Sequence, residues 1–148
     1  MPDPHAARVY LQSKTAEQVV VRLPGSNYQL HLVPGGPIVA TPQGRLTGTI
    51  RCPVWKVDEV SAGGSYIEPV IGRPRRVQGV VIGTEPATNS VVVEVASSPV
   101  VCQLPEEWDA SRIPRGCRLG LDVRSGSRLE PVVPASSPAG GPTASAVS

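Results

Sequence analysis

The chain has 148 residues and a formal net charge of +2, from 14 basic and 12 acidic side chains. Its length fits one ordinary domain or two small ones, and its near balance of charge excludes a polycation that binds nucleic acid by charge density alone. The 17 prolines and 15 glycines leave little room for long helices, and the apolar residues are mainly β-branched or aliphatic, with no phenylalanine. Because such side chains suit pleated sheets, the composition predicts an all-β protein.

The two ends of the chain differ from its centre. Residues 134–148 carry no charged side chain and almost no bulky apolar one. Ordering them would cost more entropy than burial returns, so we expect a disordered tail. Residues 1–6 are expected to be a flexible N-terminus without the features of a secretory signal. The chain contains no apolar stretch near the roughly 18 residues that cross a bilayer, which predicts no membrane association.

The cysteines and histidines show no spacing that is typical of a metal or redox site. Cys52, Cys102 and Cys117 are odd in number and lack a C-x-x-C pair, and His5 and His31 are not spaced as metal ligands. These features fit a reduced compartment, so we expect a cytoplasmic protein. The signatures of a catalytic triad and of a phosphate-binding glycine loop are missing too. The sequence therefore predicts no enzyme activity, no metal and no cofactor.

A weak internal repeat relates the two halves of the chain at the spacing that separates Val19 from Val91. Few residues are identical between the halves, so the shared order of features is the better evidence for the repeat. That order is a valine-rich strand, a turn, a second strand, a connection with proline and glycine, and a strand that begins with glycine. The matched positions are Val19, Val20 and Val21 with Val91, Val92 and Val93, Leu32 with Leu104, Pro42 with Pro114, Gly44 with Gly116, and Gly48 with Gly120.

Alternation of apolar and polar residues, combined with the turn residues, resolves each half into about five short strands. We expect them at residues 8–12, 18–23, 28–33, 45–51 and 54–60, and at 78–84, 90–95, 100–104, 118–124 and 128–133. A capping-box pattern at Thr15 and Gln18 favours a helix from residue 13, but the three valines before Pro24 argue against it. One short helical turn is expected at residues 105–111, where a proline and two glutamates suit a helix start.

This strand order predicts two similar small barrels in tandem, each with five strands. Three strands, a connection and two more strands are typical of the OB-type Greek-key barrel, and an SH3-like barrel is the alternative. Closure into barrels would also remove exposed sheet edges. We expect a first OB-like barrel at residues 7–70, a basic linker at 71–76 and a second OB-like barrel at 77–133.

Residues 23–51, LPGSNYQLHLVPGGPIVATPQGRLTGTIR, resemble the core of the S1-type OB folds, in particular the bacterial translation initiation factor one family. The matching positions are Leu23-Pro24, Tyr28, Leu30, Leu32, Gly36, Ala40, Gly44-Arg45 and Ile50-Arg51. Downstream, residues 56–60 stand in place of the glycine-aspartate turn of that family. The resemblance implies an OB fold and contact with RNA, with Arg45 and Arg51 as phosphate contacts.

The candidate nucleic-acid-binding residues lie on the first predicted barrel and on the linker. If the strands alternate as predicted, the outward side chains include polar and cationic groups on strands two and three, where OB folds bind oligonucleotides. The linker segment Gly72-Arg73-Pro74 resembles the core of an AT-hook, although Ile71 stands where that motif has another arginine. The candidate set is Arg22, Gln29, His31, Arg45, Arg51, Arg73, Arg75 and Arg76.

Ordinary solvated side chains and a solvated linker are the alternative interpretation of this set. Trp55 and Trp108 are either stacking platforms for bases or plugs in a core or an interface.

These observations predict two alternative functions. The first is a non-enzymatic protein that binds single-stranded nucleic acid, RNA more than DNA. The second is a structural or adaptor module that binds a protein partner, by strand addition or through the surface around Trp108. The oligomeric state stays open.

Overall fold

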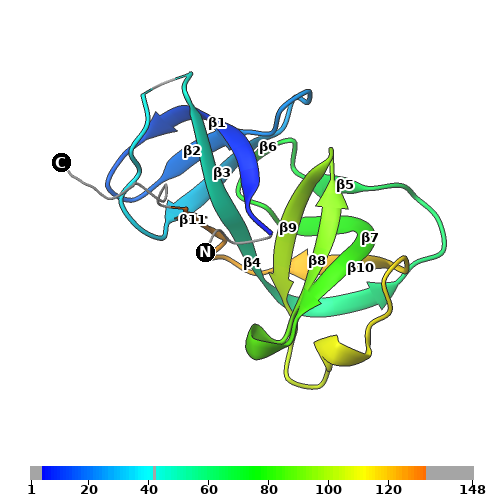
Figure 1. The fold of residues 1–148 in the computed structure, drawn as a ribbon. Helices are drawn as coiled ribbons and strands as arrows, with labels where there is room; N and C mark the ends of the chain where they lie inside the picture. Colours follow the sequence, from blue (N-terminus) through cyan, green and yellow to red (C-terminus); the bar gives the residue numbers. More distant parts are fainter. Residues whose placement is uncertain (1–4, 42, 133–148) are drawn as a thin grey trace.

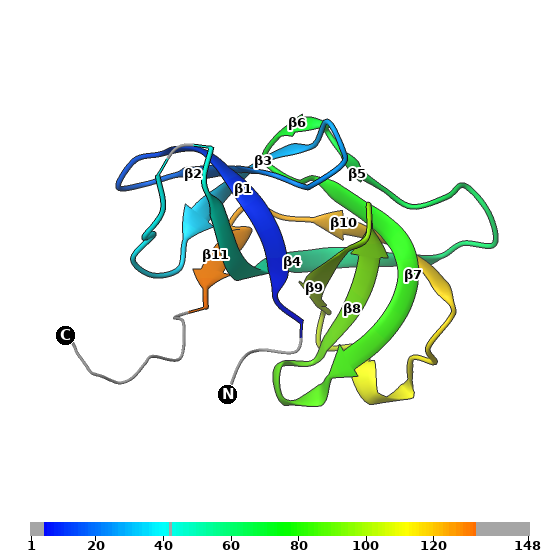
Figure 2. The ribbon, with the colours of Figure 1, turned by 45° about the horizontal axis from the view of Figure 1, so that its top comes forward.

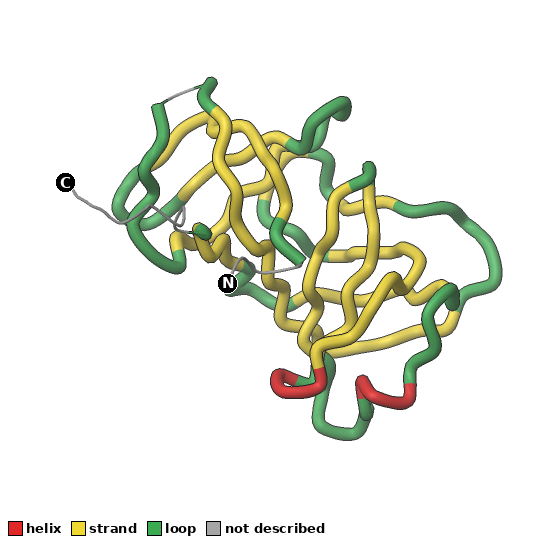
Figure 3. Tube along the Cα trace, viewed as in Figure 1, coloured by secondary structure: helices red, strands yellow, loops and turns green. Residues whose placement is uncertain are grey.

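The computed structural model describes residues 5–41 and 43–132. Within these ranges the protein is all-β, with eleven strands and two short 3-10 turns (Figure 1, Figure 3). The predicted tail, residues 134–148, and residues 1–4 of the predicted flexible N-terminus lie outside the described residues. No helix in the described part of the chain is long and apolar enough to span a bilayer.

The elements follow one another with short connections. Their bounds are β1 (Ala7–Lys14), β2 (Val19–Arg22), β3 (Gln29–Pro34), β4 (Arg45–Glu59), β5 (Tyr66–Glu68), β6 (Ile71–Gly72), β7 (Arg76–Glu85), η1 (Pro86–Thr88), β8 (Ser90–Val95), β9 (Ser98–Gln103), η2 (Ala110–Arg112), β10 (Arg118–Val123) and β11 (Arg128–Pro131). Every predicted strand overlaps one of these strands. The sequence missed β5 and β6, which have only 3 and 2 residues and therefore show no alternation.

The two helical signals have separate outcomes. The predicted turn at 105–111 is reduced to the 3-10 turn η2, which begins at Ala110 after Asp109 caps it. The rejected helix from residue 13 is not formed. The Thr15 side chain instead accepts hydrogen bonds from the amides of Glu17 and Gln18, and this closes the turn between β1 and β2. The capping pattern is therefore real, but it serves a hairpin.

Five strands close into a first ring. β1 pairs with β2, β2 with β3, β3 with β11, β11 with the first part of β4, and that part of β4 with β1. Only the pairing of β3 with β11 is parallel. Figure 1 shows this ring on the left, with β11 beside β3 and β4.

Five strands also close into a second ring, which includes the later part of β4. β7 pairs with β8, β8 with β9, β9 with β4, β4 with β10, and β10 with β7. Only β9 and β4 run parallel in this second ring. The turned view in Figure 2 shows β4 extending from the strands of the first ring to those of the second.

Strand β4 is continuous although the sequence predicted a break after residue 51. Its residues up to Arg51 pair with β1 and β11, and its residues from Arg51 onward pair with β9 and β10. Pro53 lies where the partners change, and a bulge follows between Val54 and Lys56. A proline has no N–H to give to a ladder, so it is tolerated where pairing is interrupted. The predicted strand end was wrong because Pro53 marks a change of partner.

A single apolar core extends through both rings. The predicted inward side chains are buried with at most 9% exposure, and Tyr28 is half-buried against them. The buried set is Val19, Val21, Leu23, Leu30, Leu32, Leu46, Ile50, Val91, Val93, Val95, Val100, Cys102, Leu104, Leu119, Leu121 and Val123. Period-two alternation thus placed these side chains correctly.

The predicted division into two tandem barrels is not confirmed. The structure contains closed five-stranded pairing, but the first ring takes β11 from the end of the described chain, and the second ring takes the later part of β4. The predicted linker is also not a free connection, because β6 at its start pairs with β3 and Arg76 at its end begins β7. Alternation identifies strands and faces, but it carries no information on which strand pairs with which.

Candidate functional site

A row of side chains crosses the outer face of the first ring. In the strand register, Tyr10 of β1 stands between Arg45 of β4 and Arg22 of β2, and Gln29 of β3 follows Arg22. The guanidinium carbon of Arg22 lies 4.7 Å from the centre of the Tyr10 ring, and that of Arg45 lies 6.0 Å from it. Both distances are in the range of cation–π contact. We call Tyr10, Arg22, Gln29 and Arg45 the tyrosine row.

Strand alternation explains why these four side chains share a face. Their chain neighbours are buried and point into the ring, namely Val9, Leu11, Val21, Leu30 and Leu46. Successive side chains of a strand point to opposite faces, so the row points outward. His31 stands two residues after Gln29 and therefore lies on the same face.

Residues 5–51, which supply four of the five strands of the first ring, carry mainly positive charge. Within residues 5–51, Glu17 is the single acidic residue, and it stands in the turn between β1 and β2. The basic residues of the same range are Arg8, Lys14, Arg22, Arg45 and Arg51. The net charge of the whole chain is close to neutral because the acids are concentrated in its later part. The outer face of the first ring is therefore cationic.

Arg51, predicted as a phosphate contact, is held by carboxylates between the rings. Its Nη1 lies 2.9 Å from Glu85 Oε1 and its Nε lies 2.6 Å from Glu130 Oε1. Burial lowers the pKa of Arg51, but the hydrogen bonds to these two glutamates outweigh it and the pKa lies above its ordinary value. Arg128 also donates to Glu130, over 2.8 Å. Arg51 thus links β4 to β7 and β11.

Arg76 is held in the same way on the outer face of the second ring. It donates to the Tyr66 hydroxyl over 3.3 Å and to Asp122 Oδ1 over 2.8 Å. These hydrogen bonds raise its pKa above the ordinary value. Its guanidinium lies over Gly120, where an added Cβ would overlap with it. Gly120 therefore provides the space in which Arg76 joins β5, β7 and β10.

Arg73 and Arg75 are exposed on the segment that joins β6 to β7. Arg75 is fixed by its backbone, since its amide donates to Glu68 O and its carbonyl accepts from Val123 N, both over 2.8 Å. Gly72, directly before Arg73, is the register partner of Leu30 in β3. The backbone therefore places Arg73 beside the strand that carries Gln29 and His31.

The predicted set is thus divided by the structure. Arg22, Gln29, His31 and Arg45 share one face, and Arg73 follows the strand at its edge. Arg51 and Arg76 are engaged by carboxylates, and Arg75 lies beyond buried Pro74 near β10.

Sequence reasoning missed Tyr10, the centre of the row. The signal was present, because the predicted strand at 8–12 alternates polar Arg8 and Tyr10 with apolar Val9 and Leu11. The candidate set lay on the second, third and fourth predicted strands and on the linker, and it included no residue of the first strand. Residues of β1 become relevant because β1 stands between β2 and β4.

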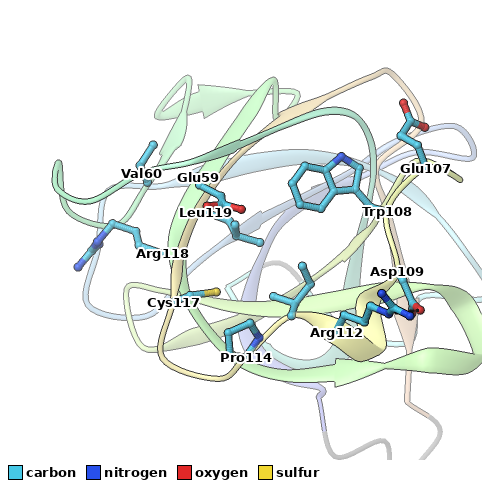
Figure 4. Close-up of a pocket in the computed structure, with 11 residues that line it drawn as sticks. Glu59, Val60, Glu107, Trp108, Asp109, Arg112, Pro114, Cys117, Arg118 and Leu119 are labelled. Atoms are coloured by element: carbon cyan, nitrogen blue, oxygen red, sulfur yellow. Dashed lines mark ion pairs between the residues drawn. The ribbon is translucent and has the colours of Figure 1, made fainter.

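A second feature is a cleft of about 650 Å³ at one end of the second ring (Figure 4). It lies between the β9–β10 connection and the end of β4. Its apolar wall is formed by Val60, Trp108, Ile113, Pro114, Cys117 and Leu119, and its charged residues are Glu59, Glu107, Asp109, Arg112 and Arg118. We call it the Trp108 cleft.

Asn89 holds the loop that carries Trp108. Its side-chain amide donates to Trp108 O over 2.9 Å, and its Oδ1 accepts from the buried amide of Ala110 over 2.9 Å. Asn89 itself has a left-handed backbone with φ of 52° at the end of η1. Asparagine tolerates this conformation better than other non-glycine residues. The two 3-10 turns are therefore tied together, as their proximity in Figure 3 shows.

The cysteines are free and two of them are buried. Cys52 and Cys102 are register partners on β4 and β9, and Cys117 is half-buried in the Trp108 cleft. Burial raises the pKa of Cys52 to about 11 and also raises the pKa of Cys102. In the described ranges, no three histidine, cysteine or acidic side chains gather where they could hold a metal ion.

Comparison with known protein families, with curated proteins and with solved structures gave no match for this chain. The resemblance of residues 23–51 to S1-type OB folds therefore stays a prediction.

The two tryptophans have different environments. Trp55 is 54% exposed on β4, so it is not a core plug. Trp108 is half-buried against the core and lines the cleft.

Proposed function

We propose that the chain is a non-enzymatic protein that binds single-stranded nucleic acid, RNA more than DNA, on the outer face of the first ring. The observation that carries this proposal is the tyrosine row, in which two arginines stand on either side of one aromatic ring. Guanidinium groups neutralise phosphates and stack on bases, and aromatic rings add stacking that tolerates any sequence. Neither arginine has a carboxylate partner in the described residues.

The strand order supports an OB-like interpretation of both rings. In an OB barrel the first three strands form a meander, strand four pairs with strand one, and strand five runs parallel to strand three. In the first ring these places are taken by β1, β2, β3, the first part of β4, and β11. In the second ring they are taken by β7, β8, β9, β10 and the later part of β4. On this interpretation the two barrels have exchanged their fifth strands.

The position of the row fits the binding face of such a barrel. OB folds bind oligonucleotides on the face around strands two and three. Here β2 carries Arg22 and β3 carries Gln29 and His31. Arg73 follows β6, which extends the same sheet beyond β3. A single-stranded oligonucleotide that crosses β4, β1, β2 and β3 would contact Arg45, Tyr10, Arg22 and Gln29 in turn.

The test is a titration of a fluorescein-labelled oligouridine, followed by anisotropy over a range of salt concentrations. The wild-type affinity should fall with salt, and replacing Arg22→Ala and Arg45→Ala together should weaken binding. The log-log salt slope should become shallower by roughly 1.4 units, because two phosphate contacts are lost and each contact to a single strand contributes about 0.7.

The matched control removes the same charge from the second ring, by Arg112→Ala with Arg115→Ala. Both of these arginines are exposed and lie far along the chain from the row. The control should change the affinity little. An absence of binding at tens of micromolar protein in low salt would contradict the proposal, and so would an equal loss in the control.

A second candidate function, the adaptor that binds a protein partner, is favoured by a different observation. The Trp108 cleft combines an apolar wall with charged residues on a surface away from the tyrosine row. The two functions use different rings.

A further inference from the structure

We propose that the Trp108 cleft binds an extended peptide segment of a partner protein, in which an apolar anchor residue stands between lysines or arginines. The proposal does not depend on the nucleic-acid function, because none of the cleft residues belongs to the tyrosine row. It rests on the size of the cleft, its apolar wall, its unpaired carboxylates and its fixed loop.

The size and composition of the cleft fit a ligand. Its volume of about 650 Å³ lies in the usual range for binding sites, which are mostly apolar with a few polar groups that orient the ligand. Trp108, Ile113 and Cys117 are each only partly buried against the core. Their remaining apolar surface is what an anchor side chain would cover.

The charges around this wall favour a cationic ligand. Glu59 and Glu107 form no ion pair with any described residue, whereas Asp109 pairs with Arg112 over 3.6 Å. Arg118 donates to Ser65 over 3.4 Å, and in Figure 4 its side chain points away from Trp108. In the same view the carboxylate of Glu59 lies beside Leu119, and Glu107 lies on the opposite side of Trp108. The two free carboxylates therefore stand on different sides of one apolar wall.

The position of Glu59 has independent support. Burial raises the pKa of the Cys117 thiol above its ordinary value, and the nearby charge of Glu59 adds to this rise. The carboxylate of Glu59 thus acts on a group inside the cleft. A guanidinium or ammonium group bound there would meet that charge and the face of an indole, to which cations are attracted.

The loop is held in place before any ligand binds. Asn89 fixes the backbone at Trp108 and Ala110, and the side chain of Asp109 accepts from the amide of Ser111 over 3.0 Å. A preformed site loses less conformational entropy on binding. An extended peptide fits better than a compact small cation, because it can place one cation near Glu59 on β4 and another near Glu107 on the β9–β10 connection, on either side of one anchor.

The experiment uses the full chain with Trp55→Phe, which leaves Trp108 as its single tryptophan. The probe is acetyl-Gly-Arg-Ile-Arg-Gly-amide, and Trp108 emission is followed during the titration. Saturable change in emission is expected. Replacing Glu59→Gln and Glu107→Gln together should weaken binding roughly 2- to 20-fold, in the range of two exposed ion pairs.

Three controls make the result specific. The variant Glu94→Gln, which removes an exposed carboxylate from β8, should leave the affinity unchanged. A probe peptide in which Ser replaces Ile, and one in which Glu replaces both Arg residues, should bind much more weakly than the original probe. Arginine amide should also bind much more weakly than the probe. Arg22→Ala with Arg45→Ala should bind the probe like wild type, so this test is separate from that of RNA binding.

Several outcomes would overturn the proposal. They are no change in emission at millimolar probe, equal binding of the acidic peptide, or an affinity that the two glutamine substitutions leave unchanged. Tighter binding of arginine amide than of the peptide would assign the cleft to a small cation. Concentration-dependent self-association that the glutamine substitutions abolish would assign it to a second copy of the chain.

Discussion

Arginines of identical chemistry have two different environments in this protein, and the neighbouring carboxylates decide between them. Arg51 and Arg76 are each bound by two acidic side chains that come from distant parts of the sequence. Arg22 and Arg45 stand beside the ring of Tyr10 instead. The first pair joins strands of the fold, whereas the second pair has no carboxylate partner among the described residues.

At the same scale, burial determines the reactivity of the cysteines. The pKa of Cys52 is raised to about 11 from 9.0, so its thiol is neutral at pH 8 and becomes a thiolate only as the pH rises through about 11. Because the thiolate is the reactive form, we expect only half-buried Cys117 to react rapidly with an aromatic disulfide reagent at pH 8. Cys52 and Cys102 should react only at the rate of unfolding.

The measurement is the number of protein thiols that react with the reagent in the first minutes, with and without denaturant. The variant Cys117→Ser should remove the rapid phase completely. Rapid reaction of a second thiol in the native protein would show that β4 and β9 separate readily. The stability that Cys52 contributes should be complete below about pH 9 and should be lost as the pH rises toward 11.

At the scale of elements, the connections carry the features that matter most for the second ring. β7 and β8 are joined through η1, and β9 and β10 through the loop with Trp108. Asn89 ends the first connection and holds the second by side-chain hydrogen bonds. Asn89, which lies in the β7–β8 connection, therefore holds the β9–β10 connection that forms a wall of the Trp108 cleft.

We expect Asn89→Ala to cost roughly 2 to 4 kcal/mol of unfolding free energy. It leaves the buried amide of Ala110 without its acceptor and puts alanine in a left-handed conformation. Asn89→Gly loses the same hydrogen bonds without the backbone strain, so it should cost about 1 kcal/mol less. Urea unfolding measures both variants. Equal stability of the wild type and Asn89→Ala would show that these hydrogen bonds contribute little.

At the scale of the whole molecule, the two rings depend on each other. β11 closes the first ring although it follows β10 in the chain, and the later part of β4 closes the second. The rings also share the core, and the ion pairs of Arg51 join strands of both. Neither half of the sequence contains all the strands of a closed ring.

This arrangement predicts that the halves do not fold alone. Fragments of residues 1–72 and 73–148 should each show little β structure by circular dichroism, because each would expose one open ring. Mixed in equal amounts, they should associate and recover the spectrum of the full chain. Two fragments that each fold separately would contradict the exchanged pairing and would restore the tandem interpretation.

The sequence by itself determined the positions of most strands and the faces of their side chains. The alternation of Val19, Val21 and Leu23, and of Leu119, Leu121 and Val123, places every one of these side chains in the core as predicted. A local pattern is sufficient here, because successive side chains of a strand necessarily point to opposite faces. The same pattern placed Arg22 and Arg45 outward.

The tertiary structure alone decided the partners. Nothing near Arg51 or Arg76 in the sequence indicates that Glu130 or Asp122 will neutralise them, and nothing local distinguishes a strand that ends at Pro53 from one that changes partner there. The closure of the first ring by β11 and the position of Tyr10 between two arginines are equally non-local. Strand pairing depends on contacts between segments far apart in the chain, whereas alternation depends only on the geometry of one strand.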